Sequence, residues 1–138
     1  LTKSGRLYSL DPIEMVWTLK STLPTTSGRN LSMAVFNDWL YVTDDVSRIH
    51  YMYVPSVDTW HALTGPNMPQ AGNSLVNSSL VCVNNKLFLI PAYNKDSEVT
   101  ETEIQVYDIF SDKWSLAKWK KSKPLRRFYG VSVVNVSM

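Results

Sequence analysis

The side chains of this chain best suited to metal or nucleophilic chemistry are two histidines and one cysteine. His50 and His61 are the only histidines, and Cys82 is the only cysteine, among 138 residues. Two unlinked histidines do not form a metal-ligand spacing, and neither a glycine-rich phosphate loop nor a nucleophile elbow accompanies them. We interpret both histidines as structural. Cys82 alternates with Val81 and Val83, as a packed thiol would. We therefore expect no enzyme, metal or cofactor.

The densest run of charge is basic and covers residues 118–127. Such a run resembles a nucleic-acid or nuclear-import patch. No periodic set of aromatic residues and no nucleic-acid fold accompanies it, and the net charge of the chain is only +2. An acidic stretch, Asp96 to Glu103, precedes the run and partly neutralises it. We interpret the run as a solvated loop and expect no nucleic-acid partner.

A short phrase recurs three times and indicates which elements position these residues. It covers Tyr53 to Trp60, Tyr107 to Trp114 and, with leucine in place of the tyrosine, Leu10 to Trp17. Each copy has an aromatic residue or leucine, a polar turn, and a tryptophan seven residues later. A phrase that returns at a period of tens of residues indicates a repeat architecture. We expect the three tryptophans to bury against neighbouring units, where large rings supply contact area.

A second landmark precedes each complete copy. Residues 33–42 and 80–89 are each an apolar run, a polar pair and a second apolar run; the pairs are Asn37-Asp38 and Asn84-Asn85. This pattern is typical of two short strands joined by a tight turn. Together with the tyrosine-to-tryptophan hairpin, it predicts four strands per unit, which we call A, B, C and D in chain order.

The unit lengths differ only between strands. Trp17 to Trp60 is 43 residues and Trp60 to Trp114 is 54. The surplus of 11 divides into seven residues in the B–C loop and four in the D–A loop. Insertions there cost little stability.

Four strands in about 45–50 residues, with a tryptophan in the last strand, are typical of one β-propeller blade. The phrase resembles the kelch repeat, whose pattern is two apolar strands, a Gly-Gly doublet, Tyr-Asp-Pro and a later tryptophan. Asp11-Pro12 and Tyr107-Asp108 match part of the Tyr-Asp-Pro element, and all three tryptophans match.

The Gly-Gly doublet of the kelch pattern is missing from both complete units. Asp44-Asp45 and Pro91-Ala92 stand in its place. Glycine tolerates positive φ and proline does not. The second complete unit should therefore enter its B–C loop by a different route from the first.

The predicted fold class is all-β: a fragment of a kelch-type β-propeller with four-stranded antiparallel blades, two complete and two partial. Residues 1–24 should form strands C and D of a partial blade, 25–70 a complete blade, 71–124 a complete blade with a long B–C loop, and 125–138 the first strand of the next blade. A closed propeller needs at least about four blades, so we expect a piece of a longer protein.

Antiparallel strands place their connections at alternate ends. The A–B and C–D turns should therefore share one face, and the B–C and D–A loops the other. All length variation falls in the B–C and D–A loops, and variable loops on a rigid scaffold often carry binding. We expect partner binding on that second face.

The kelch resemblance implies which residues on that face contact a partner. Kelch repeats often carry an arginine just before strand A, and arginine can grip a carboxylate with two hydrogen bonds. The predicted partner-binding residues are Arg29, Asp44, Asp45, Arg48, Tyr93, Lys95, Arg126 and Arg127. The alternative is that the arginines brace loops or pair with the acidic residues around them.

The resemblance implies a protein–protein interaction propeller that binds a protein or peptide segment. Intracellular kelch arrays are commonly joined to a BTB domain and act as substrate receptors of cullin-3 ubiquitin ligases, so the leading prediction is such an adaptor. One alternative is an actin-associated or scaffolding kelch protein. Another is a propeller enzyme, a copper oxidase or a sugar-modifying enzyme, with its active site in other blades.

The expected location is the cytoplasm, with the nucleus as a second option. A single cysteine excludes an internal disulfide framework and favours a reducing compartment. No apolar run approaches the ~20 residues of a membrane span, so we expect no membrane partner. Three glycosylation sequons, at Asn30, Asn77 and Asn135, support secretion as the alternative.

Overall fold

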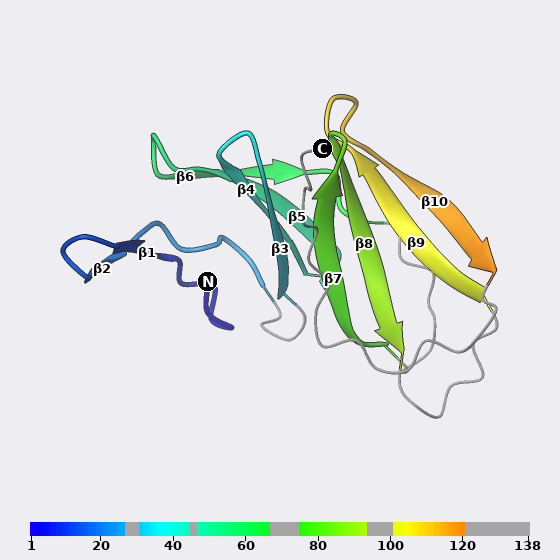
Figure 1. Cartoon of the computed structure of the whole chain (residues 1–138), viewed down its shortest axis with the longest axis horizontal. Coiled ribbons are helices and arrows are strands. Elements are labelled where there is room, and N and C mark those ends of the chain that lie inside the picture. The colour runs from blue at the N-terminus through cyan, green and yellow to red at the C-terminus, as the bar shows by residue number, and fades with distance from the viewer. Residues whose placement is uncertain (27–30, 45–46, 67–74, 94–100, 121–138) are drawn as a thin grey trace, which may run out of the picture.

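The structure is a computed structural model that describes residues 1–26, 31–44, 47–66, 75–93 and 101–120. Every regular element in these ranges is a β-strand. The strands are β1 (Tyr8–Asp11), β2 (Val16–Leu19), β3 (Leu31–Phe36), β4 (Trp39–Asp44), β5 (Ile49–Val54), β6 (Thr59–Leu63), β7 (Leu75–Val83), β8 (Lys86–Tyr93), β9 (Glu101–Asp108) and β10 (Lys113–Lys120). The predicted all-β class is confirmed (Figure 1).

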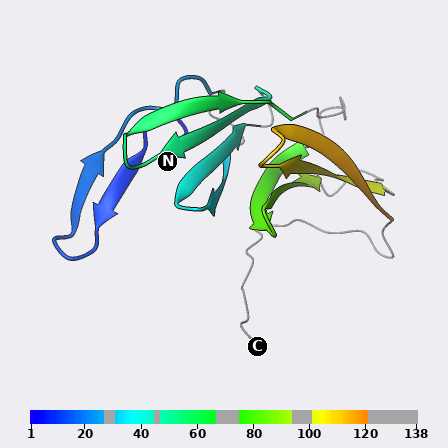
Figure 2. The same cartoon turned by 90° about the horizontal axis from the view of Figure 1, so that it is seen from above.

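The strands form open antiparallel sheets in chain order. One four-stranded sheet is β3-β4-β5-β6, a second is β7-β8-β9-β10, and β1 pairs only with β2. The three sheets follow one another along an arc (Figure 2). The prediction of four-stranded antiparallel units is confirmed, and the arrangement is consistent with a fragment of a propeller. The strand predicted over 125–138 lies outside the described residues.

The two A–B turns have the same conformation. Asn37 and Asp38 have φ of 48° and 62°, and Asn84 and Asn85 repeat these values. Positive φ at both central residues of a two-residue loop defines the type I′ hairpin turn, which asparagine and aspartate tolerate. The tight turns predicted from the two polar pairs are confirmed.

The C–D turns are four residues long, and the last residue of each has positive φ. These residues are Met15 (56°), Asp58 (51°) and Asp112 (50°). An aspartate precedes two of these turns and accepts hydrogen bonds from backbone amides within them. Asp108 Oδ1 accepts from the Phe110 and Ser111 amides, both at 3.1 Å, and Asp11 Oδ1 accepts from the Ile13 and Glu14 amides at 2.8 and 3.0 Å.

The core lies at the joint between the two four-stranded sheets. Its buried members are Tyr41 from the first sheet and Leu80, Leu87, Leu89 and Tyr107 from the second. The inner strands β3 and β7 lie side by side (Figure 1). Ser32 of β3 donates a hydrogen bond to the Ser78 carbonyl of β7 at 2.6 Å. Alternating apolar residues on facing strands therefore bury one continuous cluster.

The two sheets enter their B–C loops differently, as predicted from the proline. In the first sheet, β4 pairs with β5 as far as Asp44. In the second, pairing between β8 and β9 ends at Leu89, while β8 continues through Pro91 to Tyr93 against β7 alone.

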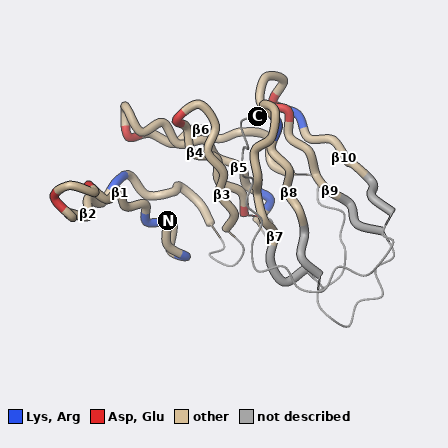
Figure 3. The backbone as a smooth tube through the Cα atoms, in the orientation of Figure 1, with Lys and Arg blue, Asp and Glu red and all other residues tan. Residues whose placement is uncertain are grey.

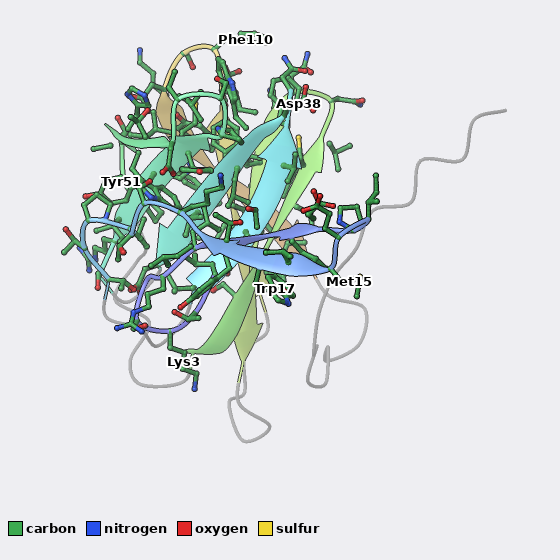
Figure 4. The ribbon with its side chains drawn as sticks, turned by 90° about the vertical axis from the view of Figure 1, so that its left-hand side faces the viewer. Lys3, Met15, Trp17, Asp38, Tyr51 and Phe110 are labelled. Carbon is green, nitrogen blue, oxygen red and sulfur yellow. The ribbon has the colours of Figure 1, made fainter. Side chains whose placement is uncertain are left out.

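The β1–β2 hairpin presents an apolar face to solvent. Tyr8 pairs with Leu19 and Leu10 with Trp17 on the same face, and all four side chains are exposed. Figure 4 shows Trp17 on this hairpin, and its side chain is 65% exposed.

The repeated tryptophans differ in their surroundings. The indole nitrogens of Trp60 and Trp114 donate hydrogen bonds to the connection that leads into their own sheet, at Ser21 O (3.0 Å) and Thr64 O (2.6 Å). Both rings are half-buried. The prediction that each tryptophan buries against the neighbouring unit is confirmed for Trp114, whose ring lies 5.2 Å from that of His50 in the first sheet. The ring of Trp60 packs on Tyr51 and Tyr53 of its own sheet and reaches the preceding segment at Ser21. Trp17 is 65% exposed in the described structure.

Candidate functional site

Among the predicted partner-binding residues, Arg48 is the one that the described structure places at the surface. It lies in the B–C turn just before β5, is exposed, and has φ of 55°. Its carbonyl oxygen sits against the Cα of Gly65, at the start of the connection from β6 to β7, leaving no room for a side chain there. The B–C turn and the following D–A connection therefore meet at Arg48.

Replacing Gly65 with alanine should disturb this contact, because the added Cβ would clash with the Arg48 backbone rather than with a flexible side chain. We expect Gly65→Ala to destabilise the protein by about 1–2 kcal/mol. Urea unfolding followed by circular dichroism would measure it. Gly5→Ala is the comparison for a glycine that has positive φ (78°) and whose added Cβ would lie 3.3 Å from its nearest neighbours, without the direct clash found at Gly65. If the Gly65→Ala variant were as stable as the parent, the close contact between Gly65 and the Arg48 backbone would be contradicted.

Asp44 has a different role from the one predicted. Its side chain is fully buried. Its carboxylate accepts hydrogen bonds from Thr26 Oγ1 (3.1 Å), from the Ser47 amide and from the Ser47 hydroxyl (both 3.2 Å). These donors occupy the carboxylate and tie the B–C turn to the D–A connection. A partner could not contact Asp44 directly in this arrangement, and we now interpret it as a brace of the loop that carries Arg48.

The other predicted contacts are not placed by the structure. Tyr93 is the last residue of β8, at the B–C end, and nothing is described of its side chain. Outside the described residues lie Arg29, Asp45, Lys95, Arg126 and Arg127. The structure therefore brings only Arg48 and Asp44 together at the B–C turn of the first sheet.

The connection from β2 to β3 runs between the two ends of the first sheet. It begins at the C–D end, where the Ser21 amide and hydroxyl donate to Asp58 Oδ1 at 2.9 and 3.0 Å. It reaches the B–C end at Thr26, which contacts Asp44. Ser21 to Thr26 are six residues, which can span about 20 Å when extended. The six-residue strand β5 has about the same length, so this connection is long enough to reach from one end of the first sheet to the other.

A repeated group of four side chains holds each connection to the sheet that follows it; we call it the inter-sheet latch. In the first latch, Asp58 accepts from Ser21 and, at 2.7 Å, from the Tyr53 hydroxyl, while Trp60 donates to the Ser21 carbonyl. The latch therefore fastens the end of one sheet to the C–D hairpin of the next.

The second latch repeats these contacts between the two complete sheets. Asp112 accepts from the Tyr107 hydroxyl (2.7 Å) and from the Thr64 amide and hydroxyl (both 3.0 Å), and Trp114 donates to the Thr64 carbonyl. Thr64 here replaces the serine of the first latch. The recurrence of the same contacts at corresponding positions marks the latch as part of the repeat unit.

Protonation states support the donor and acceptor roles in the latches. The hydrogen bond from the Ser21 backbone, followed by that from Tyr53, lowers the pKa of Asp58. Burial alone would raise the pKa of Asp112, but the hydrogen bonds from Tyr107 and Thr64 lower it. Burial, with the hydrogen bond to Asp58, raises the pKa of Tyr53 to about 12. At neutral pH the carboxylates are therefore ionised and the phenols are donors.

Sequence reasoning found the tyrosines and tryptophans of the latch but missed its aspartates. Asp58 and Asp112 each stand two residues before the tryptophan, and that spacing was available as a signal. In the first copy Met15 occupies this position and Leu10 replaces the tyrosine. The β1–β2 hairpin therefore has neither the acceptor nor the phenol of a latch.

The remaining chemistry-bearing residues are dispersed. His50 is buried in the joint between the sheets, whereas His61 is exposed on β6 and lies 3.3 Å from the Thr59 hydroxyl. Cys82 packs against the core, and burial raises the pKa of its thiol. In the described ranges, no three His, Cys, Asp or Glu side chains gather where they could hold a metal ion.

The charged residues of the described segments lie mainly at the hairpin turns and near the N-terminus (Figure 3). Within those segments, no helix has the length and apolar character needed to cross a membrane.

A scan against protein-family models finds no match to this chain. A search of curated proteins finds no significant match either. Because neither comparison identifies a relative, a functional assignment has to be argued from the sheets, latches and loops of the structure and from the sequence.

Proposed function

We propose that this protein is a protein-interaction module of the kelch-propeller type, which captures a segment of another protein on its B–C and D–A loops. The observation that carries the proposal is the contrast between constant sheets and variable loops. Hairpins, type I′ turns and latches repeat from unit to unit, while the surplus residues fall in the B–C and D–A loops. Such a scaffold holds loops of different length in fixed relative positions.

Arg48 supplies an exposed positive charge on the proposed binding face. The guanidinium belongs to an exposed residue, and the backbone beneath it is held by Asp44 and Gly65. A fixed backbone reduces the entropy lost when the side chain binds. Arginine is suited to bidentate recognition of a carboxylate. An acidic peptide segment is therefore the proposed partner, with Arg29, Arg126 and Arg127 as further proposed contacts.

The proposed cellular role is the substrate receptor of a cullin-3 ubiquitin ligase adaptor, acting in the cytoplasm. It is supported by the resemblance of the repeated phrase to kelch arrays, which commonly accompany BTB domains. In this role the propeller selects the client, and a separate domain recruits the ligase.

Affinity capture of the full-length protein from cells, analysed by mass spectrometry, tests both the protein-interaction module and the adaptor role. Recovery of cullin-3 with one or two enriched clients supports the adaptor role. Recovery of actin or other structural proteins without a cullin contradicts it and supports a scaffold. An empty capture contradicts the interaction module and favours an enzyme.

The site is tested by charge reversal in the same experiment. Arg48→Glu should reduce client recovery at least tenfold, which corresponds to about 1.4 kcal/mol of binding energy, without changing the melting temperature. Lys86→Glu is the matched control, because Lys86 is exposed at the A–B turn where β8 begins, at the opposite end of the strands from the B–C loops. Equal recovery with both variants would contradict the assignment of Arg48.

A further inference from the structure

The joint between the two four-stranded sheets contains one imidazole. His50 extends from β5 of the first sheet and is 1% exposed. Its ring centroid lies 4.4 Å from that of Tyr107 and 5.2 Å from that of Trp114, both in edge-to-face geometry, and 6.0 Å from that of Tyr41. Two of these three rings belong to the second sheet, so the imidazole is shared by both sheets.

Three buried polar atoms at this joint have no hydrogen-bond partner in the described structure. Neither His50 Nδ1 nor Nε2 makes a hydrogen bond in the described structure, and neither does Thr43 Oγ1. Thr43 is the direct cross-strand neighbour of His50 on β4, and it is also fully buried. Unpaired buried polar groups are rare and carry a desolvation cost. The joint therefore holds an imidazole whose ring nitrogens have no hydrogen-bond partner, an arrangement that favours the neutral ring over the charged one.

The groups facing His50 offset only part of the cost of protonating its ring. From the second sheet it meets Tyr107 and Trp114, and from its own sheet Tyr41 and Thr43. The carboxylate whose charge acts on His50 is that of Asp112, which already accepts three hydrogen bonds within the second latch. The Thr64 backbone favours the charged ring electrostatically, but it does not reach hydrogen-bonding geometry.

We propose that His50 makes the joint between the two sheets acid-labile, so that protonation of the imidazole separates the sheets. Separation would expose the cluster of Leu80, Leu87 and Leu89 and would change the relative positions of the loops that the two sheets carry. The second sheet has Ile104 at the position corresponding to His50, three residues before the repeated tyrosine. The repeat unit therefore does not need a histidine there, and the acid response is specific to this joint.

The direction of the pH dependence follows from the two states of the ring. Burial lowers the pKa of His50 from 6.5 to about 4 in the closed joint, and the attractions of Thr64 and Asp112 offset only part of this shift. An opened joint returns the ring to water. Because the open state binds the proton more tightly, stability is complete above about pH 6.5 and falls progressively toward pH 4. Between pH 7.5 and 5 the opening equilibrium should rise about 30-fold.

Hydrogen–deuterium exchange of the full chain tests this inference. Exchange of the β5 and β9 amides is measured at pH 7.5 and 5 and corrected for the intrinsic rate. The parent should show the 30-fold rise in opening, and His50→Ile should show little change. His61→Gln, which alters an exposed histidine on the neighbouring strand, should behave as the parent does. An equal rise in all three proteins would overturn the proposal.

A second measurement covers the case in which His50→Ile fails to fold. The imidazole resonances of His50 in the parent can be followed by NMR as the pH is lowered. A folded-state midpoint below about pH 5 supports the proposal, because it requires the closed joint to resist protonation. A midpoint at or above pH 6, close to that of a free imidazole, overturns it.

Discussion

Replacing Trp114 with alanine should destabilise the protein by about 3 kcal/mol, at the lower end of the range for large-to-small core substitutions because the ring is half-buried. The change removes ring contacts with His50 and Tyr107. It also leaves the Thr64 carbonyl without its indole donor. Urea unfolding followed by circular dichroism would measure the loss.

The chain contains a matched control for this substitution. Trp17 stands at the same repeat position but is 65% exposed, with no described latch around it. Trp17→Ala should therefore change the unfolding free energy by no more than about 0.5 kcal/mol. If Trp17→Ala and Trp114→Ala had equal effects, burial against the neighbouring sheet would not explain the repeated tryptophan.

Removing the carboxylate of the second latch should cost about 2 kcal/mol. Asp112→Ala takes the acceptor away from the Tyr107 hydroxyl and from the Thr64 amide and hydroxyl. Tyr107 is 1% exposed, so its hydroxyl cannot readily turn to water, and an unsatisfied buried donor costs about 1–3 kcal/mol. The unfolding free energy from urea titration would give the value.

A double-mutant cycle separates the latch from other effects of Asp112. Tyr107→Phe removes only the hydroxyl, so its combination with Asp112→Ala should be less damaging than the sum of the single changes. The coupling energy should be about 1 kcal/mol, as for other side chains in one hydrogen-bond network. Additive effects would show that the 2.7 Å contact contributes nothing to stability.

The strands and hairpins could be predicted because their signals are local. The pairs Asn37-Asp38 and Asn84-Asn85 provide residues that accept positive φ, and apolar runs flank them. Local turn chemistry and alternation then agree on where each strand begins and ends. The proline at position 91 also predicted that the second complete unit would enter its B–C loop by a different route. The structure shows a difference there, because pairing between β8 and β9 ends at Leu89.

The contacts that join the sheets could not be predicted in the same way. Ser21 meets Asp58 across 37 residues and Thr64 meets Asp112 across 48. The sequence around each serine or threonine does not show which aspartate it will meet. Asp44 is a similar case. Its position in a polar loop favoured exposure, but Thr26, 18 residues away, closes over its carboxylate.

The latch also has a consequence for the order of events during synthesis. Each connection is fastened by a turn that lies further along the chain, so Ser21 is made 37 residues before Asp58. At roughly 5–20 residues per second, a ribosome needs about 2–7 seconds to supply the missing acceptor. During that interval the connection that follows β2 lacks the carboxylate that fastens it. If each latch closes as soon as its aspartate is available, the sheets dock in the direction of translation, and a longer loop in the following unit lengthens the delay.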